Sequence, residues 1–356
     1  MACGGDNVTA LPPDQRARLV GAKLAALVDH HSGVRPDTVV FPGGAAALVS
    51  DTAWVLLDDR PATGLGGAVA WALRHEASRL AVVADTDAAV LARRAGTFRF
   101  PVTVWQVHGT DLVEASAAPV PDEVPVGRDE LEAAGVFTDI GIDVVIEHGV
   151  VSGEVLGLEV ARVVTVDGSA QVHPGVGRND RDGHAMLLGA DGDATRGGAA
   201  RAALERVAAD VRRVRHGVNA DRHPLGRMAR SRWLRQLVVA DPALVGGATL
   251  EPVAGTLART SVGDDGPAFA VGTDLDGGSV VVACTVGVDL DVIPAAADVR
   301  LAHDSRTEAT SRLVVVLAER DLQPVTRRLA EQLVAPAGFV TVADDWHVSS
   351  SPRPGT

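Results

Sequence analysis

Residues 80–107, LAVVADTDAAVLARRAGTFRFPVTVWQV, contain the pattern that decides the fold class. An apolar run over Leu80–Ala84 ends at Asp85, and a helical pattern follows over Asp87–Thr97. A second apolar run then covers Val102–Val107. Continuous apolar runs predict strands that are buried on both faces, and a helix of about ten residues between two of them predicts a parallel pair.

The same rhythm extends outward from this stretch. We expect further strands over 53–57, 268–272, 280–284, 313–317 and 339–342, and helices over 12–31, 66–75, 294–302 and 324–333. Three consecutive strand-like runs, at 142–147, 150–156 and 158–164, predict a meander in the middle of the chain. A helix is expected over 180–188, and two arginine-rich helices over 198–214 and 224–239. The predicted fold class is α/β, with mostly parallel sheet units at both ends and a central β-meander with arginine-rich helices.

Composition shifts divide the chain into five parts. A proline-rich linker over 118–127 separates an N-terminal α/β unit (10–117) from a central unit (128–246). A C-terminal α/β unit (247–345) and a disordered tail (346–356) complete the predicted organisation. We find no internal sequence repeat of 20–50 residues.

Several classes of protein are excluded by composition. The sequence has no apolar run of 18 residues and no signal-peptide pattern, so we expect a soluble cytoplasmic protein with no membrane partner. Cys3 and Cys284 are the only cysteines, which argues against a disulfide framework. Lys23 is the only lysine, and a Walker A nucleotide site is therefore excluded.

A sharp reversal of charge lies between Arg196 and Arg235. This segment holds 11 arginines and three acidic residues, whereas the whole chain of 356 residues carries a formal charge of −13. Three interpretations remain open: a nucleic acid or another polyanion as partner, pairing with acidic parts of the same chain, or a protein partner. The candidate ligand-binding residues of this segment are Arg201, Arg212, Arg213, Arg230, Arg232 and Trp233.

Two charged residues interrupt the apolar run Val155–Val164. With a period of two, Glu159 shares a face with Ala161, and Arg162 lies on the opposite face. A charge in such a run is costly unless it is paired, ligated or neutralised. We therefore consider a functional site here, and, as the alternative, a buried charge that has a structural partner.

The order of helix, strands bearing Asp143, Glu154 and Glu159, and helix resembles the core of the PD-(D/E)XK nuclease superfamily. The resemblance implies a divalent cation, with Mg²⁺ as the expected ion, held by these three carboxylates. Arg162 completes the set of candidate catalytic residues. The chain departs from the superfamily pattern at Ala161, where a lysine is expected.

The loop HPGVGRNDRDGH (173–184) precedes the expected helix 180–188. Arg178 and Arg181 lie close to the predicted start of that helix, where free N–H groups favour anions, so a phosphate site is one interpretation. The other is ordinary helix capping by Asn179 or Asp180.

Acidic residues also follow the predicted strands of the last third. Ligands of open α/β sheets bind beyond the carboxyl ends of the strands, which makes Asp289, Asp291 and Glu319 candidates for a ligand crevice. The capping of loops by these acids is the alternative.

Stretches such as GLEVARVV, HPLGRMARSRWLRQLVV and TVGVDLDVIPAAADVRL resemble a conserved hypothetical protein family of actinobacteria, the high-GC Gram-positive bacteria. The resemblance implies a bacterial cytoplasmic protein and supplies no activity.

The leading hypothesis from the sequence is a protein that binds or processes a phosphate-bearing ligand, foremost nucleic acid, through a degenerate nuclease-like core. The alternatives are a small-molecule or nucleotide-binding α/β enzyme that uses the C-terminal crevice, and a non-catalytic structural or adaptor protein. Whether the chain is an enzyme stays open at this point.

Overall fold

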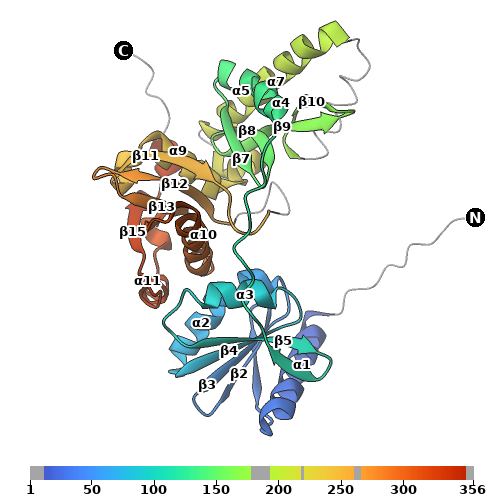
Figure 1. Cartoon of the computed structure of the whole chain (residues 1–356), viewed down its shortest axis with the longest axis vertical. Helices are drawn as coiled ribbons and strands as arrows, with labels where there is room; N and C mark the ends of the chain where they lie inside the picture. Colours follow the sequence, from blue (N-terminus) through green and yellow to red (C-terminus); the bar gives the residue numbers. More distant parts are fainter. Residues whose placement is uncertain (1–11, 178–192, 218–219, 260–265, 350–356) are drawn as a thin grey trace, which may run out of the picture. The chain divides into compact units, whose positions relative to one another are not determined.

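The computed structural model describes residues 12–177, 193–217, 220–259 and 266–349, and it has an α/β fold with three sheets (Figure 1). The chain divides into two compact units. Unit 1 contains Met1–Pro119 with Glu331–Ala335, and unit 2 contains Val120–Ala330 with Pro336–Thr356. The division falls in the predicted linker, whereas the boundary expected at residue 246 lies inside unit 2. None of the described helices combines the length and apolarity needed to cross a bilayer.

Unit 1 is built on a six-stranded sheet in the order β1 to β6. The predicted strands over 53–57, 80–84 and 102–107 are confirmed and form its parallel part. The sequence analysis missed three strands of this sheet: β2 and β6 pair antiparallel with the two edges of the parallel part, and β1 pairs antiparallel with β2. The strands are β1 (Thr38–Phe41), β2 (Gly44–Val49), β3 (Thr52–Leu57), β4 (Arg79–Ala84), β5 (Val102–His108) and β6 (Asp111–Glu114).

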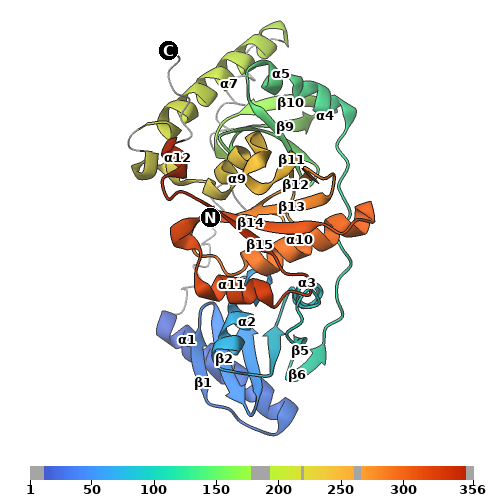
Figure 2. The same ribbon diagram turned by 90° about the vertical axis from the view of Figure 1, so that its left-hand side faces the viewer.

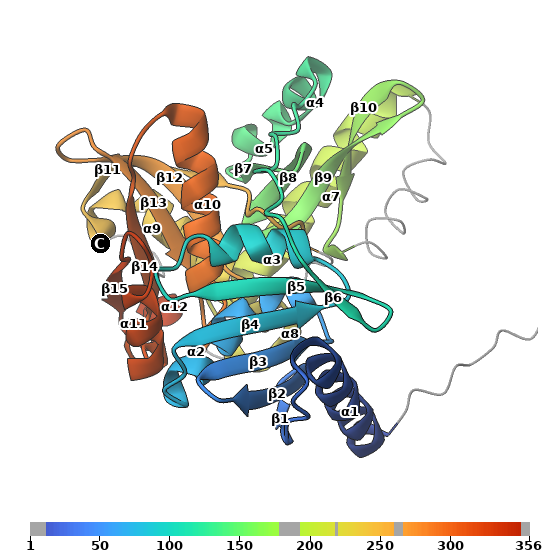
Figure 3. The same ribbon diagram turned by 60° about the horizontal axis from the view of Figure 1, so that its bottom comes forward.

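Helices cover both faces of the unit 1 sheet (Figure 3). Leu24 and Val28 of α1 pack against Trp54 and Val83 on one face. On the opposite face Leu57 contacts the start of α2 at Gly64. The helices are α1 (Pro13–Ser32), η1 (Pro61–Thr63), α2 (Leu65–Arg74) and α3 (Ala88–Ala95).

The central part of unit 2 contains a four-stranded antiparallel sheet in the order β10-β9-β8-β7. The predicted three-strand meander is confirmed, and β10 extends it by one strand. Leu204 and Val211 of α7 and Phe137 of α5 are buried against this sheet. The elements are α4 (Arg128–Ala133), α5 (Gly135–Asp139), β7 (Asp143–Glu147), β8 (Val150–Val155), β9 (Leu158–Val166), β10 (Ser169–Pro174) and α7 (Asp193–Arg215).

The second arginine-rich helix is broken, contrary to the prediction. Met228 has an extended backbone, which ends one short helix at Arg227, and Ala229, with a φ of +52°, precedes a new helix that begins at Arg230. The helix expected over 180–188 lies outside the described residues. The elements here are η2 (Ala220–Arg222), α8 (Pro224–Arg227), α9 (Arg230–Ala240) and η3 (Pro242–Val245).

The last part of unit 2 has a five-stranded sheet in the order β11 to β15. Its first three strands pair antiparallel and its last three parallel, which is the arrangement that β1 to β5 also have. Helix α9 covers one face through Trp233 and Val238, and α10 lies along the sheet in Figure 2. The elements are β11 (Gly247–Val253), β12 (Ala268–Asp274), β13 (Ser279–Cys284), α10 (Val292–Thr307), β14 (Arg312–Ala318), η4 (Glu319–Asp321), α11 (Pro324–Glu331) and β15 (Gly338–Val342).

The chain does not become irregular at residue 346, where we expected a disordered tail. Trp346–Ser349 form a short helix, α12, and Trp346 is buried with its ring 5.5 Å from that of Trp233. An aromatic side chain of this size stabilises the segment that contains it, because burial removes a large apolar area from water.

Candidate functional site

The three carboxylates expected at a metal site lie in one row across the central sheet. Asp143 of β7 is the register partner of Glu154 in β8, which in turn is the register partner of Glu159 in β9. The turn between β8 and β9 brings the two glutamates together, since Leu156 and Gly157 both have positive φ angles, as a two-residue hairpin turn requires. The sequence therefore correctly placed the three carboxylates on neighbouring strands. The partners of their side chains decide whether they can bind a metal ion.

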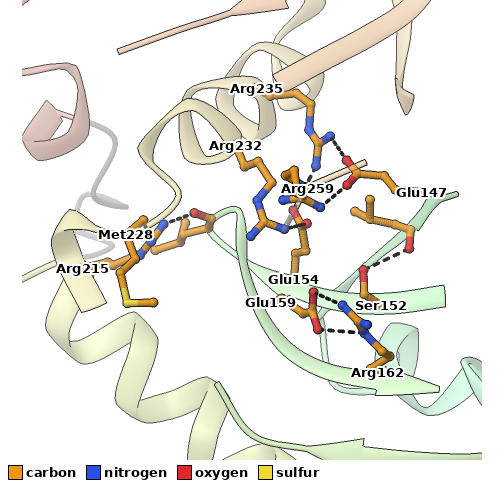
Figure 4. A network of polar contacts seen from close by, with 12 residues as sticks. Glu147, Ser152, Glu154, Glu159, Arg162, Arg215, Met228, Arg232, Arg235 and Arg259 are labelled. Atoms are coloured by element: carbon orange, nitrogen blue, oxygen red, sulfur yellow. Dashed lines mark hydrogen bonds and ion pairs between the residues drawn. The ribbon is translucent and has the colours of Figure 1, made fainter. Parts of the chain in front are cut away.

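Glu154 is buried and is held by two arginines of α9 (Figure 4). Arg232 Nη1 donates to Glu154 Oε1 at 2.6 Å, and Arg235 Nη2 donates to Oε2 at 3.0 Å. All three side chains are at least 96% inaccessible to solvent. Both carboxylate oxygens are thus occupied by charge-assisted hydrogen bonds inside the protein.

Glu147, at the end of β7, extends this network. It accepts a hydrogen bond from Arg235 Nη1 at 2.7 Å and pairs with Arg259, which follows β11. Burial by itself would raise the pKa of Glu147, but Arg235 and Arg259 together lower it below its ordinary value. Burial likewise opposes the charge of Arg235, while Glu154 and Glu147 raise its pKa overall. We call Glu147, Glu154, Arg232, Arg235 and Arg259 the buried ion network.

Glu159 and Arg162 pair with each other, which corrects the prediction that they lie on opposite faces. Arg162 Nε and Nη2 each donate to a carboxylate oxygen of Glu159 at 3.1 Å. Gly153 is the register partner of Ala161 whereas Glu154 is the partner of Glu159, so β9 has one extra residue between them. This bulge interrupts the alternation of side chains that the sequence pattern assumed.

Asp143 is the most accessible of the three carboxylates. Burial, followed by the charge of Glu154, raises its pKa above the ordinary value, and a hydrogen bond from Gln236 acts in the opposite direction. Asp143, Glu154, Arg235 and Gln236 line a cavity of about 250 Å³. The carboxylates of this cavity face arginine and amide groups of α9.

The set of carboxylates does not fit a magnesium site. Each glutamate of the row is engaged by a guanidinium, whereas Mg²⁺ needs free oxygen ligands and several waters. Within the part of the chain that the structure describes, no three His, Cys, Asp or Glu side chains are placed to hold a metal ion. We therefore derive no metal-dependent step from this row.

Most arginines expected to bind a ligand have partners in unit 2. Arg201 pairs with Glu205 at 3.1 Å, and Arg213 pairs with Asp210 at 2.7 Å. Arg212 donates to the carbonyl of Gly141 at 2.6 Å.

Arg230, the first residue of α9, pairs with Asp221 at 3.4 Å and bonds to His347 of α12 at 3.1 Å. Trp233, which we expected to stack on a base, is fully buried. Arg178 and Arg181 lie outside the described residues.

Arg215 has a purely internal role that the sequence analysis did not detect. Its guanidinium donates to the carbonyls of Leu156, Leu225 and Met228, and it lies 4.7 Å from the ring centre of Trp233. Burial, with a further contribution from the charge of Arg232, lowers its pKa. Arg215 thereby connects the β8–β9 turn with α8 and α9.

Two acidic residues near the C-terminal crevice, Asp289 and Asp321, accept hydrogen bonds from backbone groups of the loop between β13 and α10. Asp289 accepts a hydrogen bond from the N–H of Asp291 at 2.9 Å. Asp321 accepts one from Gly287 at 2.8 Å, and Glu319 begins the short helix η4 that contains Asp321. These contacts correspond to the loop-capping alternative.

Sequence reasoning missed Glu147, Arg215, Arg235 and Arg259 as members of the site. Glu147 was expected only as the last residue of the strand over 142–147. One signal was available: the arginines of α9 lie on several sides of a helix that also carries Trp233. A helix with large apolar and charged residues all around is typical of one that is buried between layers.

Comparison with known proteins does not assign the chain to a family. No protein-family model matches the chain, and no curated protein or solved structure is significantly similar to it.

Proposed function

We propose that this chain is a non-catalytic adaptor protein in which the arginine-rich helix α9 fastens the central sheet to the C-terminal α/β layer. The observation that carries the proposal is the buried ion network. It joins Glu147 and Glu154 of the central sheet to Arg232 and Arg235 of α9 and to Arg259 beyond β11. Partners then bind to other surfaces of the protein, not to these arginines.

Two physical arguments support this proposal. A catalytic carboxylate must reach the reacting group, and both oxygens of Glu154 are already within hydrogen-bonding distance of guanidinium groups in a buried position. A polyanion is attracted by unpaired, exposed arginines, whereas Arg201 and Arg213 of α7 pair with Glu205 and Asp210. The guanidiniums of Arg212 and Arg215 in the same helix bind backbone carbonyls.

Nucleic-acid binding is the second candidate function, and one observation favours it. Arg222 and Arg227, in η2 and α8, are exposed and have no partner among the described residues. Arg206 is also exposed, and its Nε donates to a carbonyl of its own helix. Proteins that bind DNA tightly through its backbone make roughly six to ten phosphate contacts. Three arginines are too few for such binding at physiological salt.

Fluorescence polarisation with labelled single-stranded and double-stranded DNA and RNA at 50 and 200 mM salt (about the range in which phosphate contacts are resolved) tests both candidates. The adaptor proposal expects no saturable binding at the higher salt. Tight binding with a steep salt dependence, lost in an Arg206→Ala/Arg222→Ala/Arg227→Ala variant, would favour the nucleic-acid function instead.

Hydrolysis provides the second test. Bis(p-nitrophenyl) phosphate with Mg²⁺ or Mn²⁺ is a general substrate for metal-dependent phosphodiesterases, and we expect no turnover above the protein-free rate. Turnover that Glu154→Gln abolishes, in a variant whose circular dichroism spectrum is unchanged, contradicts the proposal.

A further inference from the structure

A second and larger cavity, of about 510 Å³, lies in unit 2, and no residue of the buried ion network lines it. The extended segment 121–124, the turn after β7, strand β11 and helix α10 form its walls. Val253, Val271 and Val299 provide apolar surface inside it. A volume of this size falls in the range of sites that hold small organic molecules, and the apolar surface favours an aliphatic portion in such a molecule.

Two strong hydrogen-bond donors in these walls, Arg306 and Thr256, already have acceptors. Arg306 Nε donates to the carbonyl of Ala302 at 3.0 Å, and the guanidinium pairs with Glu123. The hydroxyl of Thr256 donates to Asp298, a buried carboxylate, at 2.6 Å. A ligand with many acceptors would therefore find few N–H or O–H groups to bind.

His303, which also lines the cavity, is fixed as an acceptor by a chain of hydrogen bonds. Ser311 Oγ donates its one proton to Asp304 at 2.5 Å, so the contact of 2.8 Å between Ser279 and Ser311 must use the proton of Ser279. The contact of 3.1 Å between Ser279 Oγ and His303 Nε2 then requires an N–H on Nε2. In the neutral imidazole this leaves Nδ1 with a free lone pair.

The remaining polar groups of the walls add acceptors and negative charge. Glu251 of β11 and Asp122 of the extended segment line the cavity, and neither has a partner among the described residues. The charge of Glu123 is neutralised by Arg306. Glu251 and Asp122 therefore give the walls an excess of negative charge. A complementary ligand supplies donors and positive charge at its ends and an aliphatic chain between them.

We propose that this cavity binds an aliphatic amine of the diamine or polyamine class. Ammonium groups donate to Glu251, to Asp122 and to His303 Nδ1, and the methylene chain packs against the valine surface. Ammonium groups carry three donors and no acceptor, which matches the acceptors that Glu251, Asp122 and His303 present to the cavity. This inference goes beyond the proposed adaptor function and does not depend on it.

Isothermal titration calorimetry of the full chain with putrescine and spermidine at pH 7.5 tests the inference. We expect saturable binding that weakens about tenfold in Glu251→Gln, because one charge-assisted hydrogen bond contributes on the order of one decade in affinity. Asp122→Asn should also weaken it. Asp276→Asn, which removes an exposed acid in the turn after β12, is the matched control and should leave the affinity unchanged.

Two probes separate a defined amine site from attraction to an acidic protein. 1,4-Butanediol has the carbon chain of putrescine without its charge and should show no saturable binding. Mg²⁺ should not displace the amine at equal charge concentration. The proposal is overturned by the absence of saturable amine binding, by equal affinities of the Glu251→Gln, Asp122→Asn and Asp276→Asn chains, or by displacement with Mg²⁺.

Discussion

Removing the carboxylate of Glu154 perturbs the buried ion network at its centre. In Glu154→Gln the amide cannot accept from both guanidiniums, and Arg232 loses the one carboxylate within ion-pair distance of it in the described part of the chain. Arg235 keeps its bond to Glu147 at 2.7 Å. The variant therefore leaves one cationic side chain, 3% exposed, without a counter-charge.

Removing one partner of a buried ion pair costs about 3–5 kcal/mol, because the remaining charge stays out of water. That loss lowers the folding equilibrium constant by roughly two to three and a half orders of magnitude. With a urea m-value of about 2–3 kcal/mol/M for a unit of this size, the unfolding midpoint should fall by about 1–2.5 M.

Urea unfolding followed by tryptophan fluorescence measures this effect. A background in which Trp54, Trp71 and Trp105 are replaced by Phe leaves Trp233 and Trp346 of unit 2 as reporters. Asp210→Asn is the matched control, since Asp210 and Arg213 are 60% and 76% exposed and such a pair contributes less than about 1 kcal/mol. A loss below about 1 kcal/mol in Glu154→Gln would refute a structural role for the network.

A second variant separates the loss of a pair from the loss of packing. Glu154→Leu/Arg232→Met removes both charges and keeps apolar volume, and such replacements are often neutral or stabilising. We expect the double variant to be more stable than Glu154→Leu alone. A double variant that is as unstable as the sum of its single changes would mean that the two residues do not interact.

Three further predictions follow from local geometry. Gly157→Ala should lower the free energy of unfolding by about 1–3 kcal/mol more than Gly168→Ala in the same assay. Both glycines have a positive φ. A Cβ at Gly157 would lie 2.2 Å from the backbone nitrogen of Trp233, whereas a Cβ at Gly168 would meet nothing within 4 Å. Burial raises the pKa of Cys284 to about 12, so the thiol of the folded Cys3→Ser chain should react with Ellman's reagent at pH 8 only after denaturation. Because Arg235 and Arg259 lower the pKa of Glu147 in the fold, its contribution to stability should be complete above the unfolded pKa of about 4.3 and disappear as the pH falls through the lower folded value.

Each of these predictions has a clear contrary result. Equal losses at the two glycines would mean that the β8–β9 turn does not pack against α9. Fast labelling of the native Cys3→Ser chain would place Cys284 at an accessible position. A stability difference between the natural chain and Glu147→Gln that stays constant from pH 7 to pH 3 (about the range that spans the carboxyl pKa values) would contradict the pairing of Glu147 with arginine.

The regular elements were predictable where the pattern is local. The run Leu80–Ala84 predicted a buried parallel strand, and β4 is that strand. The antiparallel strands β1, β2, β6, β10 and β11 were missed, since their short or interrupted runs have no distinctive period. The break at Ala229 was also missed, because nothing in residue type alone requires a left-handed backbone at alanine.

The candidate site shows the same division. The alternation of side chains placed Glu159 and Arg162 on opposite faces of β9, and a bulge brought them together. Asp143, Glu154 and Glu159 were correctly taken as residues of neighbouring strands, because consecutive strands with short turns pair with each other. Which cation each would face was not predictable from the strands themselves.

The amino-acid sequence by itself determined the α/β class, the meander and the concentration of arginines, because hydrophobic period and residue type act over a few neighbouring positions. The tertiary structure decided what those arginines do. Glu154 and Arg232 are 78 positions apart, and Glu147 and Arg259 are 112 apart. A charge is neutralised by whatever group lies within a few ångströms of it, and that distance is set by how the sheets and helices pack.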